Sequence, residues 1–67
     1  MRTHTVAAVE VAVGDKLLDG TDLYEVTKAE RPEAGVVGIT IATDIGEHYF
    51  MCPILDPLVI TYESLTL

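Results

Sequence analysis

The chain has 67 residues, of which 49% are hydrophobic, and its eleven acidic and four basic residues give a net charge of −7. A chain of this length forms one domain, expected over residues 1–67, and buries only about 60% of the surface that its unfolded form exposes. A single cysteine excludes an internal disulfide, and with two histidines it offers no ligand set for structural zinc. The high apolar fraction points to a face covered by a partner or an oligomer, or to a compact monomer with some exposed apolar area.

Charge and hydropathy also exclude whole classes of partner. The basic residues are Arg2, Lys16, Lys28 and Arg31, so residues 32–67 contain neither lysine nor arginine. Affinity for nucleic acids and for anionic membranes comes from such residues, so direct binding to either is not expected. No segment approaches the roughly 18 apolar residues of a membrane span, and the N-terminal pattern does not fit a signal peptide. A lone reduced thiol then suggests a cytoplasmic protein.

The first third of the chain predicts short strands separated by tight turns. Residues 9–13 alternate valine with glutamate or alanine, a period of two that is typical of a half-buried strand, and residues 5–8 extend it. Gly14-Asp15 is an expected turn, because glycine accepts positive φ and aspartate bonds nearby backbone amides. Leu17-Leu18 continues the strand briefly, and residues 19–22 form a second turn.

Two further strands are expected in the middle of the chain. Residues 23–30 place Tyr24 and Val26 on one face, and the proline-containing segment 31–35 is an expected loop. Residues 36–43 are rich in β-branched side chains and form the strongest predicted strand. The apolar side chains expected on one face of that strand are Val37, Ile39 and Ile41.

Gly38 interrupts the strongest predicted strand. A glycine inside a strand indicates a bulge or a close approach, and either feature would help a small barrel to bend.

The last third predicts a hairpin and a closing strand. Residues 44–46 form a turn, and residues 47–52 return as a strand that Pro53 ends. Residues 54–57 are expected to form one 3₁₀ turn or a tight loop, and residues 58–62 a final strand. Residues 64–67 either fray or dock their two leucines. The sequence therefore predicts an all-β fold, a small barrel of five or six short antiparallel strands.

The order of these elements resembles the SH3-like class of small barrels. More specifically, the segments 11–15, 24–26 and 56–60 resemble the V-x-x-G-D, Y-x-V and D-x-P-V-x-V patterns of small barrel proteins from actinobacteria and their bacteriophages. The likeness covers nearly the whole chain, although each motif is generic. That family carries no established activity, so the resemblance implies a fold and a phage accessory role rather than a chemistry. The chain departs from peptide-binding SH3 domains in having no tryptophan and from RNA-binding barrels in being acidic.

No arrangement of reactive side chains predicts an enzyme, a metal site or a cofactor. Cys52 and His48 share a strand face but lie roughly 13 Å apart at about 3.3 Å per residue, too far for a nucleophile and its base. Cys52 is interpreted as a small core residue, His48 as a solvent-side residue and His4 as a terminal one. Asp15, Asp19 and Asp22 do not match a calcium loop, because Lys16, Leu17 and Leu18 interrupt its pattern of oxygen ligands, and they are interpreted as turn-forming residues.

The segment 47–52 is the expected interaction site, because it is apolar on both faces. Tyr49 and Met51 alternate with Phe50 and Cys52, so a partner can be contacted from either side. The residues expected to make the contact are Tyr49, Phe50, Met51, Asp44 and Glu47. We expect a non-enzymatic module that binds a host protein or itself as a homo-oligomer. If this face is exposed, Phe50→Ser should abolish association and leave the fold intact.

The acidic side chains of the second half allow an alternative function. Asp44, Glu47, Asp56 and Glu63 have no neighbouring lysine or arginine in sequence. They form either a solvated surface that keeps an apolar protein soluble or a face for a basic partner. In the second case the protein would be an acidic inhibitor that mimics DNA and blocks a nucleic-acid-binding host protein.

Overall fold

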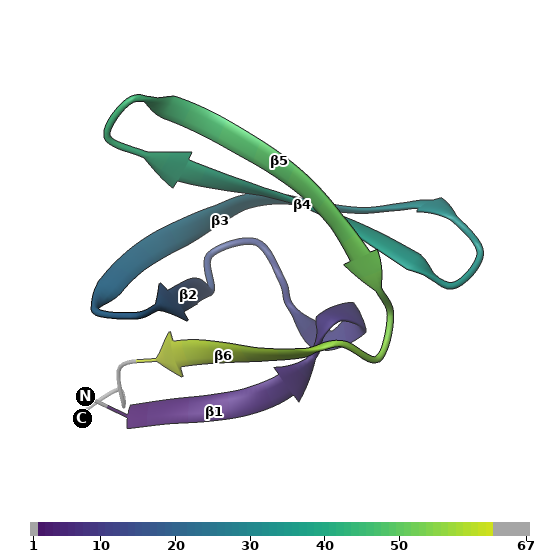
Figure 1. Cartoon of the computed structure of the whole chain (residues 1–67), viewed down its shortest axis with the longest axis horizontal. Helices are drawn as coiled ribbons and strands as arrows, with labels where there is room; N and C mark the ends of the chain where they lie inside the picture. Colours follow the sequence, from purple (N-terminus) through teal and green to yellow (C-terminus); the bar gives the residue numbers. More distant parts are fainter. Residues whose placement is uncertain (1, 63–67) are drawn as a thin grey trace.

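The computed structural model describes residues 2–62 and contains six antiparallel strands in one sheet, in the order β1-β6-β2-β3-β4-β5 (Figure 1). The strands are β1 Arg2–Ala7, β2 Lys16–Asp19, β3 Asp22–Glu33, β4 Val36–Thr43, β5 Gly46–Pro53 and β6 Pro57–Tyr62. One 3₁₀ turn, Ala8–Glu10, follows β1. The expected all-β class and the small barrel of short antiparallel strands are confirmed.

The sheet curls because its longest strand pairs with different neighbours along its length. The first residues of β3 pair with β2, and residues from Glu25 onward pair with β4. The β3–β4 register shifts between Val26 and Lys28 and again between Glu30 and Glu33. Such irregularities bend a strand and increase its twist. The β4–β5 hairpin therefore rises over the β1–β6 pair in Figure 1, and the core lies between them.

The core forms on the side of the sheet that the alternation in β4 predicts. Val37, Ile39 and Ile41 are all buried, and Val26 of β3 is fully buried beside them. Because successive strand residues point to opposite faces, the residues between these three in β4 face the other side of the sheet. The remaining buried apolar residues come from the 3₁₀ turn and its exit, β2 and β6, and are Ala8, Val11, Leu17 and Ile60.

The strand predicted over residues 9–13 is wrong. Ala8–Glu10 is a 3₁₀ turn, Val11 is buried, and Val13 leaves 63% of its surface exposed. The backbone N–H groups of Ala8 and Val9 donate to the carbonyls of Asp56 and Ile54, at 2.8 and 3.0 Å. These bonds join the two chain segments at one end of the barrel. The chain therefore turns after β1 to reach that end, and alternation of small apolar residues could not reveal this.

Two boundaries further along the chain also differ from expectation. Residues 54–55 form a tight turn, closed by a hydrogen bond from the Asp56 N–H to the Pro53 carbonyl at 3.1 Å, and not the 3₁₀ turn that was the other expectation. The 3₁₀ segment that the structure describes is Ala8–Glu10. The expected loop over residues 31–35 is shorter, because β3 continues to Glu33 and only Ala34-Gly35 turn. Pro32 lies within the irregular part of the β3–β4 pairing, where a missing N–H is tolerated. Residues 64–67 lie outside the described residues.

The turn predicted at Gly14-Asp15 is confirmed, and its bonds show how it is held. The Asp15 carboxylate accepts a hydrogen bond from the Ala12 N–H at 2.9 Å. Gly14 donates to the Val26 carbonyl, and the Asp15 carbonyl accepts from the Val26 N–H. The turn is thus fixed against the middle of β3, beside the first register shift.

Candidate functional site

Strand β5 ends the sheet order, and its exposed surroundings are apolar. Among the described residues, four of the six exposed large hydrophobic side chains lie in the segment 45–55: Ile45, Tyr49, Met51 and Leu55. The other edge, β1, exposes the polar residues Arg2 to Thr5 instead. An edge strand directs N–H and C=O groups away from its sheet, and polar side chains discourage pairing there. The two edges of this sheet therefore differ in what they offer to another chain.

The residues of β5 divide between two faces. Glu47, Tyr49 and Met51 share the outer face, on which Tyr49 exposes 46% and Met51 59% of its surface. Phe50 is partly buried and packs against the core. Asp44 lies in the turn before β5, and it is exposed. Of the residues predicted to contact a partner, the fold brings Glu47, Tyr49 and Met51 together and turns Phe50 inward, so Phe50→Ser would also disturb the core.

Gly38 gives the Tyr49 ring its position. Tyr49 pairs with Thr40, and its ring lies across Gly38, so that its Cε1 and Cζ atoms are 2.9 Å from where a Cβ atom at Gly38 would stand. The β4–β5 register runs without a shift from Val36 to Thr43, so the predicted close approach, and not a bulge between these strands, explains this glycine. A ring resting on a glycine backbone keeps its other face available to a partner.

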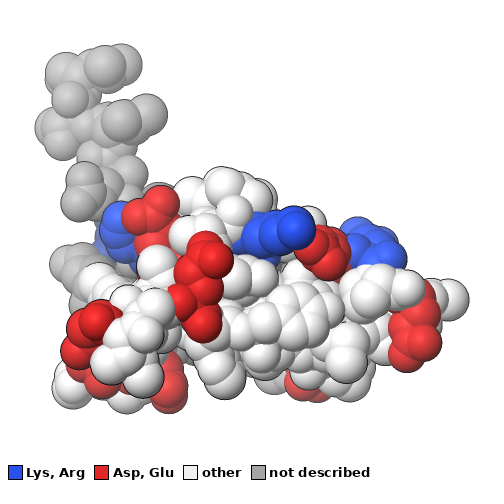
Figure 2. Space-filling view, turned by 90° about the horizontal axis from the view of Figure 1, so that it is seen from above, with Lys and Arg blue, Asp and Glu red and all other residues white. Residues whose placement is uncertain are grey.

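Charged residues of both signs accompany the outer face. Lys28 Nζ lies 2.8 Å from Glu30 Oε1. The hydrogen bond to Glu30 and then the negative charge of Glu30 are the largest causes that raise the pKa of Lys28. The Thr27 hydroxyl donates to Glu47 Oε2 at 3.0 Å. Figure 2 shows carboxylates in separate groups on this view of the molecule, with lysine and arginine between some of them.

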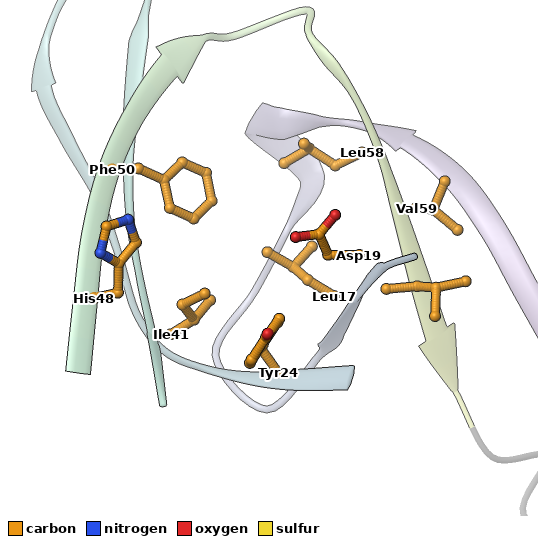
Figure 3. Close-up of a pocket in the computed structure, with 9 residues that line it drawn as sticks. Leu17, Asp19, Tyr24, Ile41, His48, Phe50, Leu58 and Val59 are labelled. Carbon is orange, nitrogen blue, oxygen red and sulfur yellow. The ribbon is translucent and has the colours of Figure 1, made fainter. Parts of the chain in front are cut away.

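A cleft of about 300 Å³ opens on the inner side of the curled sheet. Its walls come from β2 to β6 and include Leu17, Phe50 and Leu58, while Asp19 contributes a carboxylate (Figure 3). His48 stacks on Phe50, with the ring centroids 6.3 Å apart. No sequence pattern indicated this cleft.

The Tyr24 phenol lies at the acidic end of the cleft. The negative charge of Asp22 is the largest cause that raises the pKa of Tyr24, followed by burial and by the charges of Asp19 and Asp44. Two separate turns, β2–β3 and β4–β5, therefore bring carboxylates to one end of the cleft. Asp44 lies in the β4–β5 turn, whereas Asp19 and Asp22 are the paired strand residues on either side of the Gly20-Thr21 turn, so the turn expected over residues 19–22 is shorter than predicted.

Cys52 packs against the core in a partly buried position. Burial, and to a smaller extent the charge of Asp56, raises the pKa of its thiol. Within residues 2–62, no group of three histidine, cysteine or acidic side chains could hold a metal ion. His48 is exposed on β5. The arrangement supports packing by Cys52 rather than nucleophilic chemistry.

We expect Cys52 to be alkylated slowly in the folded protein. The thiolate is the reactive form, so a raised pKa leaves less of it at pH 7.5. Iodoacetamide labelling followed by mass spectrometry should be several-fold slower in buffer than in urea, and faster in Asp56→Asn than in the wild type. Equal rates in buffer and urea would contradict the packing of this side chain.

The comparisons with known proteins concern the fold. No protein-family model matches the chain, and no curated protein matches it. The solved structure of a translation initiation factor eif-5a family protein from Naegleria fowleri ATCC 30863 superposes with a TM-score of 0.67 over 92% of this chain, at 13% identity. The chain spans 49% of that protein. The likeness supports the small β-fold and says nothing about activity. No helix in the described part of the chain is long and apolar enough to cross a membrane.

Proposed function

We propose that this chain is a non-enzymatic protein-interaction module that captures an extended segment of a partner protein on the free edge of β5. The observation that carries the proposal is the run of exposed apolar side chains along that edge, from Ile45 to Leu55. An extended segment added to a sheet edge gains main-chain hydrogen bonds, and its alternate side chains gain specific contacts. Tyr49 and Met51 would supply those contacts on the outer face.

Charge favours a basic partner over a second copy of the chain. With a net charge of −7, two copies repel one another over distances where a basic protein is attracted. The resemblance to barrel proteins of actinobacteria and their phages suggests that the partner is a host protein, met in the host cytoplasm by a phage accessory protein. Self-association through β5 is the competing outcome of the experiment below.

A DNA-mimicking inhibitor receives less support from the surface. Such a protein needs carboxylates spaced regularly along one face, whereas the view in Figure 2 shows separate acidic groups with basic residues among them. The salt dependence of partner binding tests this alternative, because binding through a phosphate-like row of charges weakens steeply with salt.

We expect Met51→Lys to weaken partner binding by about tenfold or more, the loss typical of a central contact residue. The partner is first captured from host lysate at low and moderate salt and identified by mass spectrometry, and its affinity is then measured by calorimetry with purified proteins. The matched control is Thr5→Lys, which adds the same charge to an exposed position on the β1 edge.

Two outcomes of this experiment would contradict the proposed function. Equal affinities of Met51→Lys and wild type for the purified partner would exclude β5 as the docking edge. Recovery of the bait alone, together with a dimer mass in solution, would replace the partner protein by a second copy of this chain. Far-UV circular dichroism of both lysine variants checks that neither substitution has changed the fold.

A further inference from the structure

The cleft on the inner side of the sheet borders the proposed docking edge. β5 and β6 are not neighbours in the sheet order, yet Phe50 of β5 and Leu58 of β6 point toward one another across the opening (Figure 3). Side chains of an extended segment alternate between two faces. A segment paired with the free edge of β5 would therefore present every second side chain to this inner side.

The walls of the cleft suit an apolar group. Leu18, Phe50 and Leu58 line it and are all only half-buried, so apolar surface remains exposed to water inside the opening. A volume of about 300 Å³ is at the small end of ligand sites and holds one large side chain. Burying such a group there would stabilise the complex by removing apolar surface from water on both sides.

The charge at the mouth suits a cation. Asp19 lines the cleft, and no lysine or arginine is among its nine lining residues. Figure 3 shows the Asp19 carboxylate directed into the opening, near Leu17. Asp22 and Asp44 act on the nearby Tyr24 phenol strongly enough to raise its pKa, so their charges add to that of Asp19 at this end.

We infer that the cleft receives an apolar side chain of the partner segment, and that Asp19 at its mouth pairs with a lysine or arginine close to that side chain in the same segment. The inference rests on the proposed function for the identity of the occupant. The inference adds the chemistry that the cleft recognises, which is an apolar group next to a cation. A partner segment with this pair of groups is thereby distinguished from a purely apolar or an acidic segment.

The n-hexylammonium ion is a probe that carries both groups without a peptide backbone. Titrated into the isotopically labelled protein and followed by amide chemical shifts, it should shift the resonances of Leu17, Phe50 and Leu58 with a saturating dependence on concentration. Hexanoate, which has the same tail and the opposite charge, should leave these resonances unchanged over the same range. Equal responses to the two probes, no response, or shifts spread over the acidic surface would each overturn the inference.

A matched pair of variants tests the role of Asp19. Asp19→Asn should weaken hexylammonium binding by about two- to fivefold, the range of one partly exposed ion pair. Glu33→Gln removes the same charge at the exposed end of β3 and should leave the affinity unchanged. An equal loss in both variants would show that only the net charge matters.

Met51→Lys separates this inference from the proposed function. That substitution lies on the outer face of β5, so it should weaken partner binding as predicted above and leave the hexylammonium response intact. Unchanged partner affinity in Met51→Lys contradicts the proposed docking edge. The cleft inference fails on the probe titration alone, whatever the partner does.

Discussion

Ile39→Ala is expected to lower the free energy of unfolding by about 2–5 kcal/mol, enough to unfold much of a domain this small. Ile39 is 0% exposed and lies in the centre of β4, paired with Ala29 of β3 on one side and Phe50 of β5 on the other. Removing the three outer carbons of Ile39 leaves a cavity. The hydrogen bonds of β4 to the strands on both sides, β3 and β5, keep this cavity from collapsing.

The chain contains a matched control for this substitution. Ile45→Ala makes the same chemical change at a residue that is 99% exposed in the β4–β5 turn, and it should alter stability by no more than about 0.5 kcal/mol. Urea unfolding followed by far-UV circular dichroism measures both variants against the wild type. Similar midpoints for the two variants would mean that the core is not centred on Ile39.

Gly46→Asn is expected to cost about 1–3 kcal/mol, because only glycine adopts its backbone conformation without strain. Gly46 has a φ of +121° directly after the Asp44-Ile45 turn. The Thr43 hydroxyl accepts a bond from the Ile45 N–H at 3.3 Å and donates to the Gly46 carbonyl, so the turn is held from both sides. A residue that cannot follow this path would displace the start of β5.

The control for Gly46 is Gly20 in the β2–β3 turn. Its φ of +63° lies in the left-handed region that asparagine accepts, so Gly20→Asn should cost clearly less than Gly46→Asn. Thermal unfolding of the two variants compares them directly. If Gly20→Asn proved the more destabilising, backbone strain at the start of β5 would not be the cause.

Local patterns predicted most of the strands, because turns and alternation are local properties. The bounds of β4 follow from β-branched residues between two turns, and the burial of Val37 and Ile39 follows from their parity. The same alternation failed at residues 9–13, where the bonds of Ala8 to Asp56 and of Val9 to Ile54 decide the path. The burial of Ala8 and Val11, three positions apart, is a spacing that fits a 3₁₀ turn better than a strand.

The sequence predicted only part of the two candidate surfaces, the β5 edge and the cleft. The apolar character of β5 could be read directly, but its position at an edge depends on the strand order. That order places β6 between β1 and β2, which chain order does not suggest. The cleft depends on residues from five strands, so side chains as distant in sequence as Asp19 and Leu58 line one opening. No local sequence pattern indicates that side chains so distant in sequence line one cleft.

The insertion of β6 between β1 and β2 also has a consequence for how the domain is made. Arg2 pairs with Tyr62, 60 positions further on, and Lys16 pairs with Thr61. Pairs between residues so distant in sequence form slowly. The ribosome also synthesises strands β1 to β5 before β6, the strand that pairs with both β1 and β2. Until β6 emerges, β1 and β2 both expose unpaired backbone. The nascent chain is therefore vulnerable to edge-to-edge aggregation until residues 57–62 have emerged and paired with β1 and β2.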